Sequence, residues 1–258
     1  MHILVTGGAG FIGSHVVDAC LAAGHSVAVV DNLSTGKPEN VHPGAELLIV
    51  DLRDRDTLRK LVERQRPEVI CHLAAKVNVR ESQSQPLTYA EVNTLGSLAV
   101  LEAARSGGVR KVVYASTGGA VYGEPRYLPV DEEHPIAPLD PYGASKHHVE
   151  HYFPIYQALH GIDYTILRFP NVYGPRQDPY GEAGVVAIWS AAMLEGRQPL
   201  INGSGEQERD FVYVGDIARA MVLALDQGAG QTINLGSGVG TSINSLFALL
   251  SQITGSAS

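Results

Sequence analysis

The turn between the first predicted strand and the first predicted helix is the feature that most constrains this chain. An apolar run at residues 3–5 leads into TGGAGFIG at residues 6–13, and the apolar residues that follow recur at helical spacing. Glycines at 7, 10 and 13 permit a tight turn and a close approach of ligand to backbone. A helix N-terminus offers free N–H groups and partial positive charge. The turn therefore predicts a pyrophosphate site, with a purely structural glycine turn as the alternative.

Short β-branched runs alternate with helical patterns over the first 170 residues. The runs lie near residues 3–5, 27–31, 47–51, 69–73, 111–115 and 164–167, and the helical patterns near 11–23, 55–65, 87–106 and 142–160. Continuous apolar strands separated by helices are typical of a parallel sheet covered on both faces. We therefore predict an α/β fold, a Rossmann-like doubly wound parallel sheet.

The pattern loosens after about residue 170, where strands and helices become short and mixed. A strand near 232–235 and a helix starting near Ser242 are the last clear elements. We expect residues 1–170 to form a cofactor-binding Rossmann domain that includes the helix near 142–160. We expect residues 171–258 to form mostly a small mixed C-terminal substrate lobe, with some segments returning to the main sheet.

Charge and hydropathy exclude several classes of partner. Lysine and arginine total 19 against 27 aspartates and glutamates, a formal charge of −8, and no basic stripe is present, so we expect no nucleic-acid partner. No apolar stretch is long enough to span a bilayer, and the N-terminus lacks the pattern of a signal peptide. Cys20 and Cys71 lie in apolar segments without metal-ligand spacing, so we expect reduced, buried thiols in a cytoplasmic protein.

Three further features fall where a dinucleotide site needs them. Asp31 ends the second run and can accept both hydroxyls of an adenine ribose, which favours NAD over NADP, although Lys37 lies nearby. Asp51, followed by Leu52, ends the third run and can meet the adenine amino group, with a helix cap as the alternative role. The segment HLAA at residues 72–75 provides small residues that let backbone pass beside the cofactor.

Tyr142 and Lys146 are four residues apart on a predicted helix, so their side chains share one face. A nearby ammonium stabilises a phenolate and lowers the pKa of a tyrosine, which makes Tyr142 a candidate general base. The pair follows the fifth predicted strand, which ends in Ser116 and Thr117.

Taken together, these motifs resemble the extended short-chain dehydrogenase/reductases, and within them the UDP-glucose 4-epimerase branch. The resemblance covers nearly the whole chain. It is carried by TGGAGFIGSH, Asp31-Asn32, HLAA, Asn93, Tyr142 with Lys146, RFPNVYGPRQ (168–177) and RDFVYVGD (209–216). It implies an NAD used catalytically, which takes a hydride from a nucleotide sugar and returns it to the opposite face.

The resemblance also implies a role for each matching residue. Tyr142 takes the proton of the sugar 4-hydroxyl, Lys146 holds the nicotinamide ribose, and Asn93 supports the nicotinamide end of the site. Asn171 bonds the sugar diphosphate and Arg209 clamps it, with a surface ion pair as the alternative for Arg209. The expected cofactor contacts are Gly7, Gly10, Phe11, Ile12, Gly13, Asp31, Asn32, Asp51, Leu52, Leu73, Ala74, Ala75, Asn93, Tyr142, Lys146 and Phe169.

The chain departs from the family pattern at Gly118 and at its C-terminal end, and Ala120 bears on the choice of reaction. Gly118 stands where members usually carry the Ser or Thr that bonds the reacting hydroxyl, so Thr117, or else Ser116, has to take that role. Ala120 replaces the glutamate of related dehydratases and decarboxylases, which favours epimerisation. The chain also stops at Ser258 without the R-x-G-D segment that members use to contact the nucleotide, so we expect a reduced substrate lobe.

We therefore expect an NAD-dependent nucleotide-sugar 4-epimerase that interconverts UDP-galactose and UDP-glucose. Epimerisation of a UDP-N-acetylhexosamine or a UDP-uronate, and a non-catalytic NAD-binding sensor, remain as alternatives. The resemblance implies a homodimer through the helices near 87–106 and 142–160. His147 and His151 have metal-like spacing, but a solvated or subunit-contact face is favoured over a metal. Pro154 is expected to kink its helix or end a segment of it.

Overall fold

The computed structural model describes residues 1–180 and 184–255 and is built on one seven-stranded parallel sheet. The strand order is β3-β2-β1-β4-β5-β6-β9, which confirms the doubly wound Rossmann-like prediction. The strands are β1 (His2–Thr6), β2 (Ser26–Asp31), β3 (Glu46–Ile49), β4 (Val69–His72), β5 (Lys111–Thr117), β6 (Asp163–Phe169) and β9 (Gln231–Asn234).

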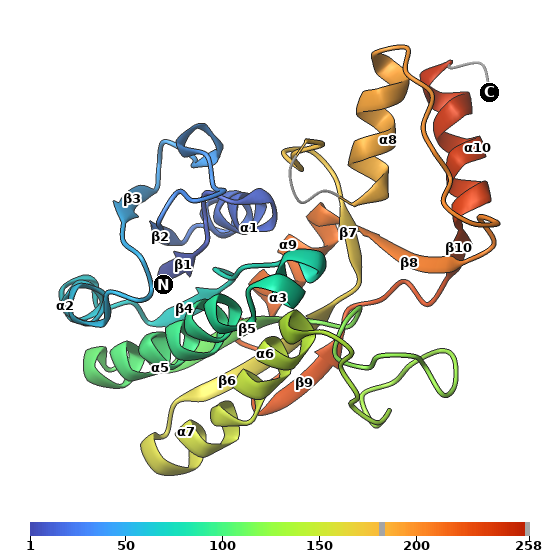
Figure 1. Cartoon of the computed structure of the whole chain (residues 1–258). Helices are drawn as coiled ribbons and strands as arrows, with labels where there is room; N and C mark the ends of the chain where they lie inside the picture. Colours follow the sequence, from blue (N-terminus) through green and yellow to red (C-terminus); the bar gives the residue numbers. More distant parts are fainter. Residues whose placement is uncertain (181–183, 256–258) are drawn as a thin grey trace.

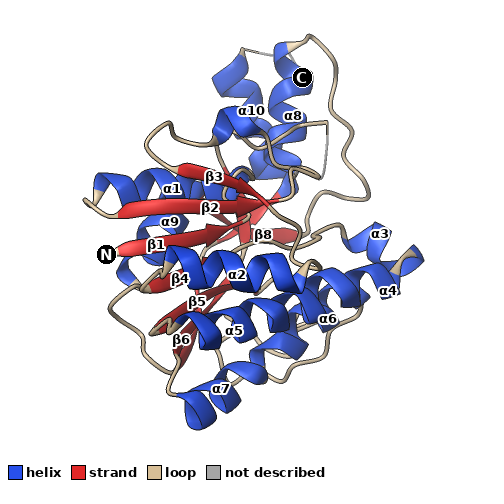
Figure 2. Cartoon of the chain, turned by 90° about the vertical axis from the view of Figure 1, so that its left-hand side faces the viewer, coloured by secondary structure: helices blue, strands red, loops and turns tan. Residues whose placement is uncertain are grey.

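Helices cover both faces of this sheet (Figures 1 and 2). One face packs against α2 (Arg55–Gln65), α5 (Gly96–Gly107), α6 (Pro141–Glu150) and α7 (Tyr152–His160). The other packs against α1 (Phe11–Ala22) and α9 (Val214–Leu223). Because helices cover both faces, the inner strands are buried continuously rather than alternately: β5 is buried along its whole length and β6 at every residue but its first.

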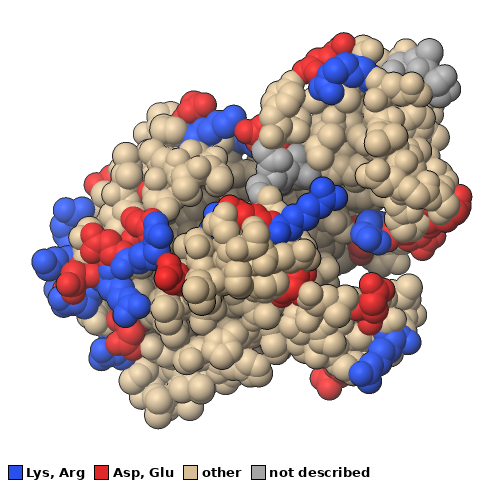
Figure 3. Space-filling view, viewed as in Figure 1, with Lys and Arg blue, Asp and Glu red and all other residues tan. Residues whose placement is uncertain are grey.

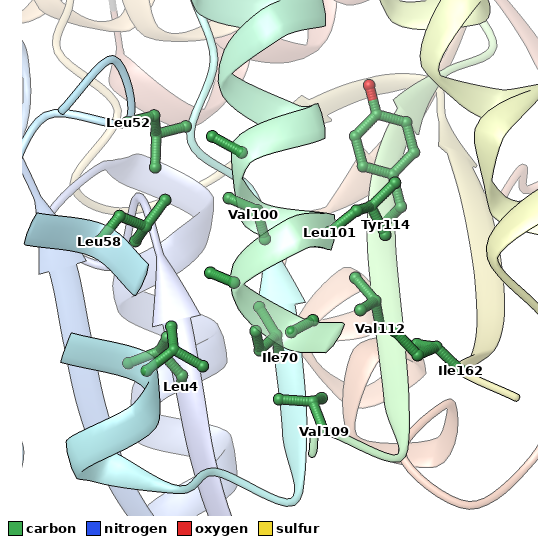
Figure 4. Packing of buried hydrophobic residues seen from close by; sticks show 14 of the residues in the cluster. Leu4, Leu52, Leu58, Ile70, Val100, Leu101, Val109, Val112, Tyr114 and Ile162 are labelled. Carbon is green, nitrogen blue, oxygen red and sulfur yellow. The ribbon is translucent and has the colours of Figure 1, made fainter. Parts of the chain in front are cut away.

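Leucine, isoleucine and valine side chains fill the space between α5 and the strands (Figure 4). Leu4, Ile70 and Val112 come from three adjacent strands and meet Val100 and Leu101 of α5, all of them at most 1% exposed. Burying side chains of this size contributes about 1.5–3 kcal/mol each. This layer holds the strand ends, and therefore the residues that follow them, in fixed positions.

Two glycines of the first turn have no room for a side chain. Gly7 has a φ of +73°, and a Cβ on it would lie 2.7 Å from the backbone nitrogen of Ala74. A Cβ on Gly13 would lie 2.0 Å from the carbonyl oxygen of Gly7. The turn therefore packs backbone against backbone, between β1, α1 and the loop that follows β4.

Two predicted helices are divided in the structure. The segment near 87–106 consists of α4 (Pro86–Tyr89), a π-helical turn at Ala90–Leu95 and then α5. The segment near 142–160 breaks at His151, between α6 and α7. Pro154 falls in the first turn of α7, where its missing N–H removes no hydrogen bond, so the prediction that it ends a segment is confirmed.

The remaining elements form a smaller lobe at the upper right of Figure 1. It contains β7 (Asn171–Tyr173), β8 (Glu208–Tyr213), β10 (Gly240–Ser242), α8 (Val185–Leu194) and α10 (Ile243–Thr254). Trp189 of α8 packs against Ile243, Leu246 and Leu250 of α10. Two segments beyond residue 170, α9 and β9, return to the main body. Residues 181–183 and 256–258, part of the lobe expected over 171–258, lie outside the described residues.

Short helices near the site complete the described elements, namely α3 (Val79–Ser84) and a 3₁₀ turn at Pro38–Asn40. On the face shown in Figure 3, basic and acidic side chains of the described residues are interspersed rather than gathered into a basic stripe. Among the described helices, none is both long enough and apolar enough to cross a bilayer.

Candidate active site

The predicted site residues gather at the carboxyl ends of β1, β2, β4 and β5, where the smaller lobe faces the main body (Figure 1). Parallel strands all point the same way, so the loops that leave them share one edge of the sheet. Figure 3 shows the surface indented between the main body and the upper-right lobe.

The N-terminus of α1 is open to an anion. Gly10 occupies the N-cap position, and no side chain caps the helix, so the first-turn N–H groups of Phe11 and Ile12 have no intrahelical acceptor. A Cβ at Gly10 would meet only the carbonyl oxygen of Gly7, at 3.3 Å, and its φ of −79° suits any residue. An uncapped helix start with room above it fits a pyrophosphate.

Asp31 is buried at the end of β2 and faces this turn. Its Oδ2 accepts a hydrogen bond from the Ala9 N–H at 3.1 Å, and its Oδ1 accepts one from the Leu33 N–H at 2.9 Å. A Cβ on Gly36 would lie 2.9 Å from Oδ1, so that glycine leaves space beside the carboxylate. Lys37 forms an ion pair with Asp178 at 3.3 Å, which gives its ammonium a partner other than a ribose phosphate.

Asp51 is held more tightly than the sequence suggests. Its two oxygens accept hydrogen bonds from Nε and Nη2 of Arg53 at 2.9 and 2.8 Å, and Asn32 donates to Oδ2 at 2.8 Å. Bonding to Arg53 holds the pKa of this carboxyl well below its usual range. Asp54, not Asp51, caps α2. Leu52 is buried beneath Gly96, so it lies under this end of the site.

The loop after β4 carries Leu73, Ala74 and Ala75, all half-buried, past the glycine turn. The Ala74 N–H donates to Thr6 Oγ1 at 3.3 Å, and the same hydroxyl bonds His72 Nδ1 at 2.6 Å. Burial lowers the pKa of His72 to about 3, so its ring is neutral at working pH. His72 therefore supports this loop through its hydrogen bond to the Thr6 hydroxyl.

Asn93 is fully buried within the π-helical turn and clamps two elements together. Its Oδ1 accepts from the Lys76 N–H at 2.8 Å, and its Nδ2 donates to the Lys76 carbonyl at 2.9 Å and to Ser145 Oγ at 2.9 Å. Asn93 thus fixes the loop after β4 against α6. The π-turn aims this side chain inward between the two elements.

Tyr142 and Lys146 lie on α6, which begins with the Asp140 cap and Pro141. Thr117, the last residue of β5, hydrogen-bonds the Tyr142 phenol through its side chain. The Lys146 ammonium is buried and lies 4.2 Å above the centre of the Tyr114 ring. The structure therefore brings three predicted residues, Thr117, Tyr142 and Lys146, to one place.

Desolvation dominates the ionisation of this pair. Burial raises the pKa of Tyr142 to about 12, against a smaller lowering by the Thr117 hydroxyl. Burial lowers the pKa of Lys146 to about 7. Lys146 is not among the groups that shift the Tyr142 pKa, so the lowering that the sequence suggested is not found in this structure.

Ser116 and Thr117 face different partners. Ser116 Oγ donates to Glu150 Oε1 at 2.5 Å, inside the protein, while Thr117 bonds Tyr142. Gly118 donates its N–H to the Phe169 carbonyl at 2.8 Å, which joins β5 to β6 where both strands end. Of the two candidate hydroxyls, Thr117 is the one placed at the reacting group.

Asn171 and Arg209 are exposed on the smaller sheet. Asn171 of β7 pairs with Phe211 of β8, and Arg209 lies two residues before Phe211, so the three side chains share one face. Arg209 Nη1 donates to the Glu208 carbonyl at 2.7 Å. No carboxylate pairs with Arg209 among the described residues, so the surface ion pair considered for it is not found there.

His147 of α6 and His151, which follows that helix, are bonded to each other. His147 and His151 approach each other at 3.1 Å between their Nε2 atoms. Within the part of the chain that the structure describes, no group of three or more His, Cys, Asp or Glu residues could hold a metal ion.

Sequence reasoning missed the buried residues that support the site. They are Thr6, His72, Ser145, Glu150 and Arg168. Glu150 could have been found from the sequence, because it lies four residues after Lys146, just as Lys146 lies four residues after Tyr142. The others needed the three-dimensional arrangement to be recognised.

Known proteins are similar to this chain over nearly all of its length. Residues 3–236 match the model of the NAD dependent epimerase/dehydratase family. The UDP-glucose 4-epimerase of Mycolicibacterium smegmatis is 46% identical over 261 residues, which cover 99% of this chain and 83% of that protein.

Two solved structures are similar over the whole chain. UDP-glucose 4-epimerase from Thermotoga maritima with UDP-glucose has a TM-score of 0.98 and 47% identity, covering 100% of this chain and 84% of that one. The Thermus thermophilus UDP-glucose 4-epimerase in complex with NAD has a TM-score of 0.94 and 46% identity, with the same coverages of 100% and 84%.

Replacing Gly10 with alanine tests the anion site. The methyl group should leave the unliganded melting temperature nearly unchanged but crowd the first-turn N–H groups. Losing one hydrogen bond to a charged group costs about 1.5–3 kcal/mol, so NAD affinity should fall at least about tenfold in a calorimetric titration. Gly44→Ala is the matched control, because a Cβ there meets a comparable contact, His42 Nδ1 at 3.1 Å, and lies near Leu21 at the C-terminal end of α1, away from the first-turn N–H groups. Unchanged NAD affinity in Gly10→Ala would contradict the prediction that the pyrophosphate binds at the N-terminus of α1.

Proposed function

Because the chain belongs to the NAD dependent epimerase/dehydratase family, we propose that it interconverts UDP-galactose and UDP-glucose through a 4-keto sugar. The observation that carries the proposal is the side-chain hydrogen bond through which Thr117 lowers the pKa of the Tyr142 phenol. The relatives named above, which are UDP-glucose 4-epimerases, support the same reaction.

Tyr142 is the proposed acid and base at the sugar 4-hydroxyl. When bound, oxidised NAD supplies the acceptor for the hydride of C4 and a positive charge in the site. Tyr142 takes the hydroxyl proton as C4 is oxidised and returns it as C4 is reduced on the other face. Thr117 donates a hydrogen bond that stabilises the phenolate, which is the direction of its effect on the Tyr142 pKa.

The Lys146 side chain can change its protonation state near neutral pH. Burial brings its pKa to about 7, so the ammonium is only partly populated at neutral pH. An added hydrogen-bond acceptor, such as a ribose hydroxyl, favours the charged form. We propose that Lys146 holds the nicotinamide ribose and that its charged form lowers the pKa of Tyr142 in the loaded enzyme.

Asn171 and Arg209 are proposed to hold the diphosphate of the substrate. They share one face of the smaller sheet, and the Arg209 guanidinium, which bonds the Glu208 carbonyl through Nη1 and pairs with no carboxylate among the described residues, has further N–H groups for a planar, charged partner. Asp31 is proposed to select NAD, because a carboxylate there repels a 2′-phosphate. Asn93 is proposed to support the nicotinamide end indirectly, by fixing the loop after β4 against α6.

The absence of a carboxylate at position 120 supports epimerisation over further reactions of the keto sugar. Ala120 is buried, and a Cβ on Gly143 would lie 2.6 Å from its carbonyl oxygen, so α6 packs closely against this segment. With no acid or base at that position, reduction is the route left for the intermediate.

We propose that residues 1–170 bind NAD and that 171–258 mostly bind the nucleotide sugar. We also propose a cytoplasmic location, where the buried thiols of Cys20 and Cys71 remain reduced.

We propose a homodimer through α5 and the α6–α7 pair. Ile155 and Leu159 of α7 are 47% and 70% exposed, and Leu95 at the start of α5 is 43% exposed. Tyr156 of α7 donates to Glu102 of α5 at 2.6 Å, so the two helices lie side by side and present one continuous face. An exposed apolar face of this kind is typical of a subunit contact.

Turnover of UDP-galactose tests the function. The purified protein with NAD should produce UDP-glucose, and Tyr142→Phe should lower kcat by at least about 100-fold while NAD stays bound, because the proton acceptor is lost. UDP-N-acetylgalactosamine and UDP-galacturonate are assayed in parallel. Turnover of one of these alone would replace the proposed substrate, and NAD binding without turnover of any would favour the sensor alternative.

Thr117 and Ser116 provide a matched pair of hydroxyl deletions. Thr117→Val should lower kcat by about 10²-fold or more, because it removes the hydrogen bond that stabilises the phenolate. Ser116→Ala should lower kcat by less than about tenfold, since its hydroxyl points to Glu150. Steady-state rates on UDP-galactose measure both, and a reversed order would assign the role to Ser116.

The dimer is tested by charging its apolar face. Ile155→Glu combined with Leu159→Glu should convert the dimer to a monomer in sedimentation velocity, because buried unpaired carboxylates are costly. Leu249→Glu, at a 52% exposed position on α10, is the control and should leave the dimer intact. A wild-type monomer, or a dimer that survives both charges, would contradict this interface.

A further inference from the structure

Glu150 continues the line of reactive residues on α6 by one more turn. Tyr142, Lys146 and Glu150 are spaced i, i+4 and i+8, so they form one stripe along the helix. Glu150 is 6% exposed, and a buried carboxylate needs a reason to remain there. The proposed mechanism leaves it without a role.

The Glu150 carboxylate is held from three elements. Arg168 of β6 donates from Nε to Oε1 at 3.1 Å and from Nη2 to Oε2 at 2.6 Å, a two-point pairing. Ser116 of β5 donates to Oε1 at 2.5 Å, and His147 of α6 lies 3.1 Å from Oε2. Burial raises the pKa of Glu150, but these bonds outweigh it and bring the pKa to about 2. Glu150 is therefore a fixed anion at working pH.

Its bond to Ser116 fixes the end of β5. Ser116 pairs with Arg168 in the sheet, and Thr117 pairs with Phe169. The carboxylate therefore ties together both side chains of one cross-strand pair, immediately before the residue that contacts Tyr142. With Ser116 held inward, the Thr117 hydroxyl is the one left at the reacting group.

Its charge also acts on Lys146. Burial lowers the pKa of Lys146, and the field of Glu150 is what opposes this. The ionisable groups around Glu150 are Lys146 and His147 on its own helix and Arg168 on β6. Two tyrosines complete the set: Tyr114, and Tyr122, whose hydroxyl accepts a hydrogen bond from Arg168. The Glu150 carboxylate thus lies between Lys146, which can lose its proton near neutral pH, and Arg168, which stays positively charged.

We propose that Glu150 is a positioning residue of the active site: anchored by Arg168, it directs the Thr117 hydroxyl through Ser116 and supplies a negative charge one helical turn from Lys146. The effect on turnover rests on the proposed function, whereas the effect on the charge of Lys146 does not. The hydrogen bonds of Glu150 run to Ser116, His147 and Arg168, so it acts through other residues.

Three variants separate this role from plain stability. Glu150→Gln removes the charge and keeps the size. Glu150→Gln with Arg168→Met removes both charges and leaves no unpaired ion in the core, so it should recover the melting temperature that the single variant loses. Glu63→Gln is the control, because Glu63 is also a helical carboxylate paired with an arginine but lies on the exposed face of α2.

Two measurements are made on each protein. The first is kcat and KM for UDP-galactose with NAD bound. The second is the pKa of Lys146, followed by NMR of ¹³Cε-labelled lysine in the purified protein and assigned with Lys146→Arg.

Both Glu150 variants should show a Lys146 pKa lower by about one unit. Their kcat should fall roughly 10–100-fold while KM changes less than about threefold, because the chemical step rather than binding is affected. Recovery of kcat together with the melting temperature in the double variant would overturn the proposal, since the role would then be structural. An unchanged Lys146 pKa would overturn it too. A wild-type protein inactive on UDP-galactose would contradict the proposed function, and the lysine titration would still decide the role of Glu150.

Discussion

Removal of water from Tyr142 and Lys146 is the constraint on which the site depends. Both groups lie where α6 meets β5, and burial pushes each towards its neutral form, with pKa values of about 12 and 7. A neutral phenol is a poor base and a neutral amine a poor counter-charge. The protein must therefore surround the pair with groups that favour the charged forms. Thr117 does this for the phenol and Glu150 for the ammonium, each against a larger desolvation effect.

The groups that favour charge are held by the sheet rather than by flexible loops. Thr117 is the last residue of a fully buried strand, and Glu150 is bonded to the two neighbouring strands through Ser116 and Arg168. On the other side, Asn93 joins α6 to the loop after β4. The apolar layer under α5 keeps these strands in register, so packing far from the chemistry sets the geometry at the reacting atoms.

The sheet, the glycine turn and the Tyr142–Lys146 pair could be predicted because each has a local signature. Apolar runs, glycines at a strand end and i, i+4 spacing are all visible in one stretch of sequence. The break of one helix at His151 followed from Pro154, but the π-turn around Asn93 did not, because no residue type demands it. The partners of Glu150 could not be predicted either, since they come from strands 34 and 18 residues away.

The position of the two residues proposed to hold the diphosphate explains how one site can reduce either face of a sugar. Asn171 and Arg209 lie on the smaller sheet, whereas Thr117 lies on the main one and Tyr142 on α6, which packs against the main sheet. An intermediate gripped through its diphosphate is held at a distance from its reacting carbon. The single bonds between the two ends then allow the sugar ring to turn over without release. Tight binding of the ring itself would present only one of its faces for reduction. Inversion therefore requires that the residues proposed to hold the diphosphate be separated from the reacting groups.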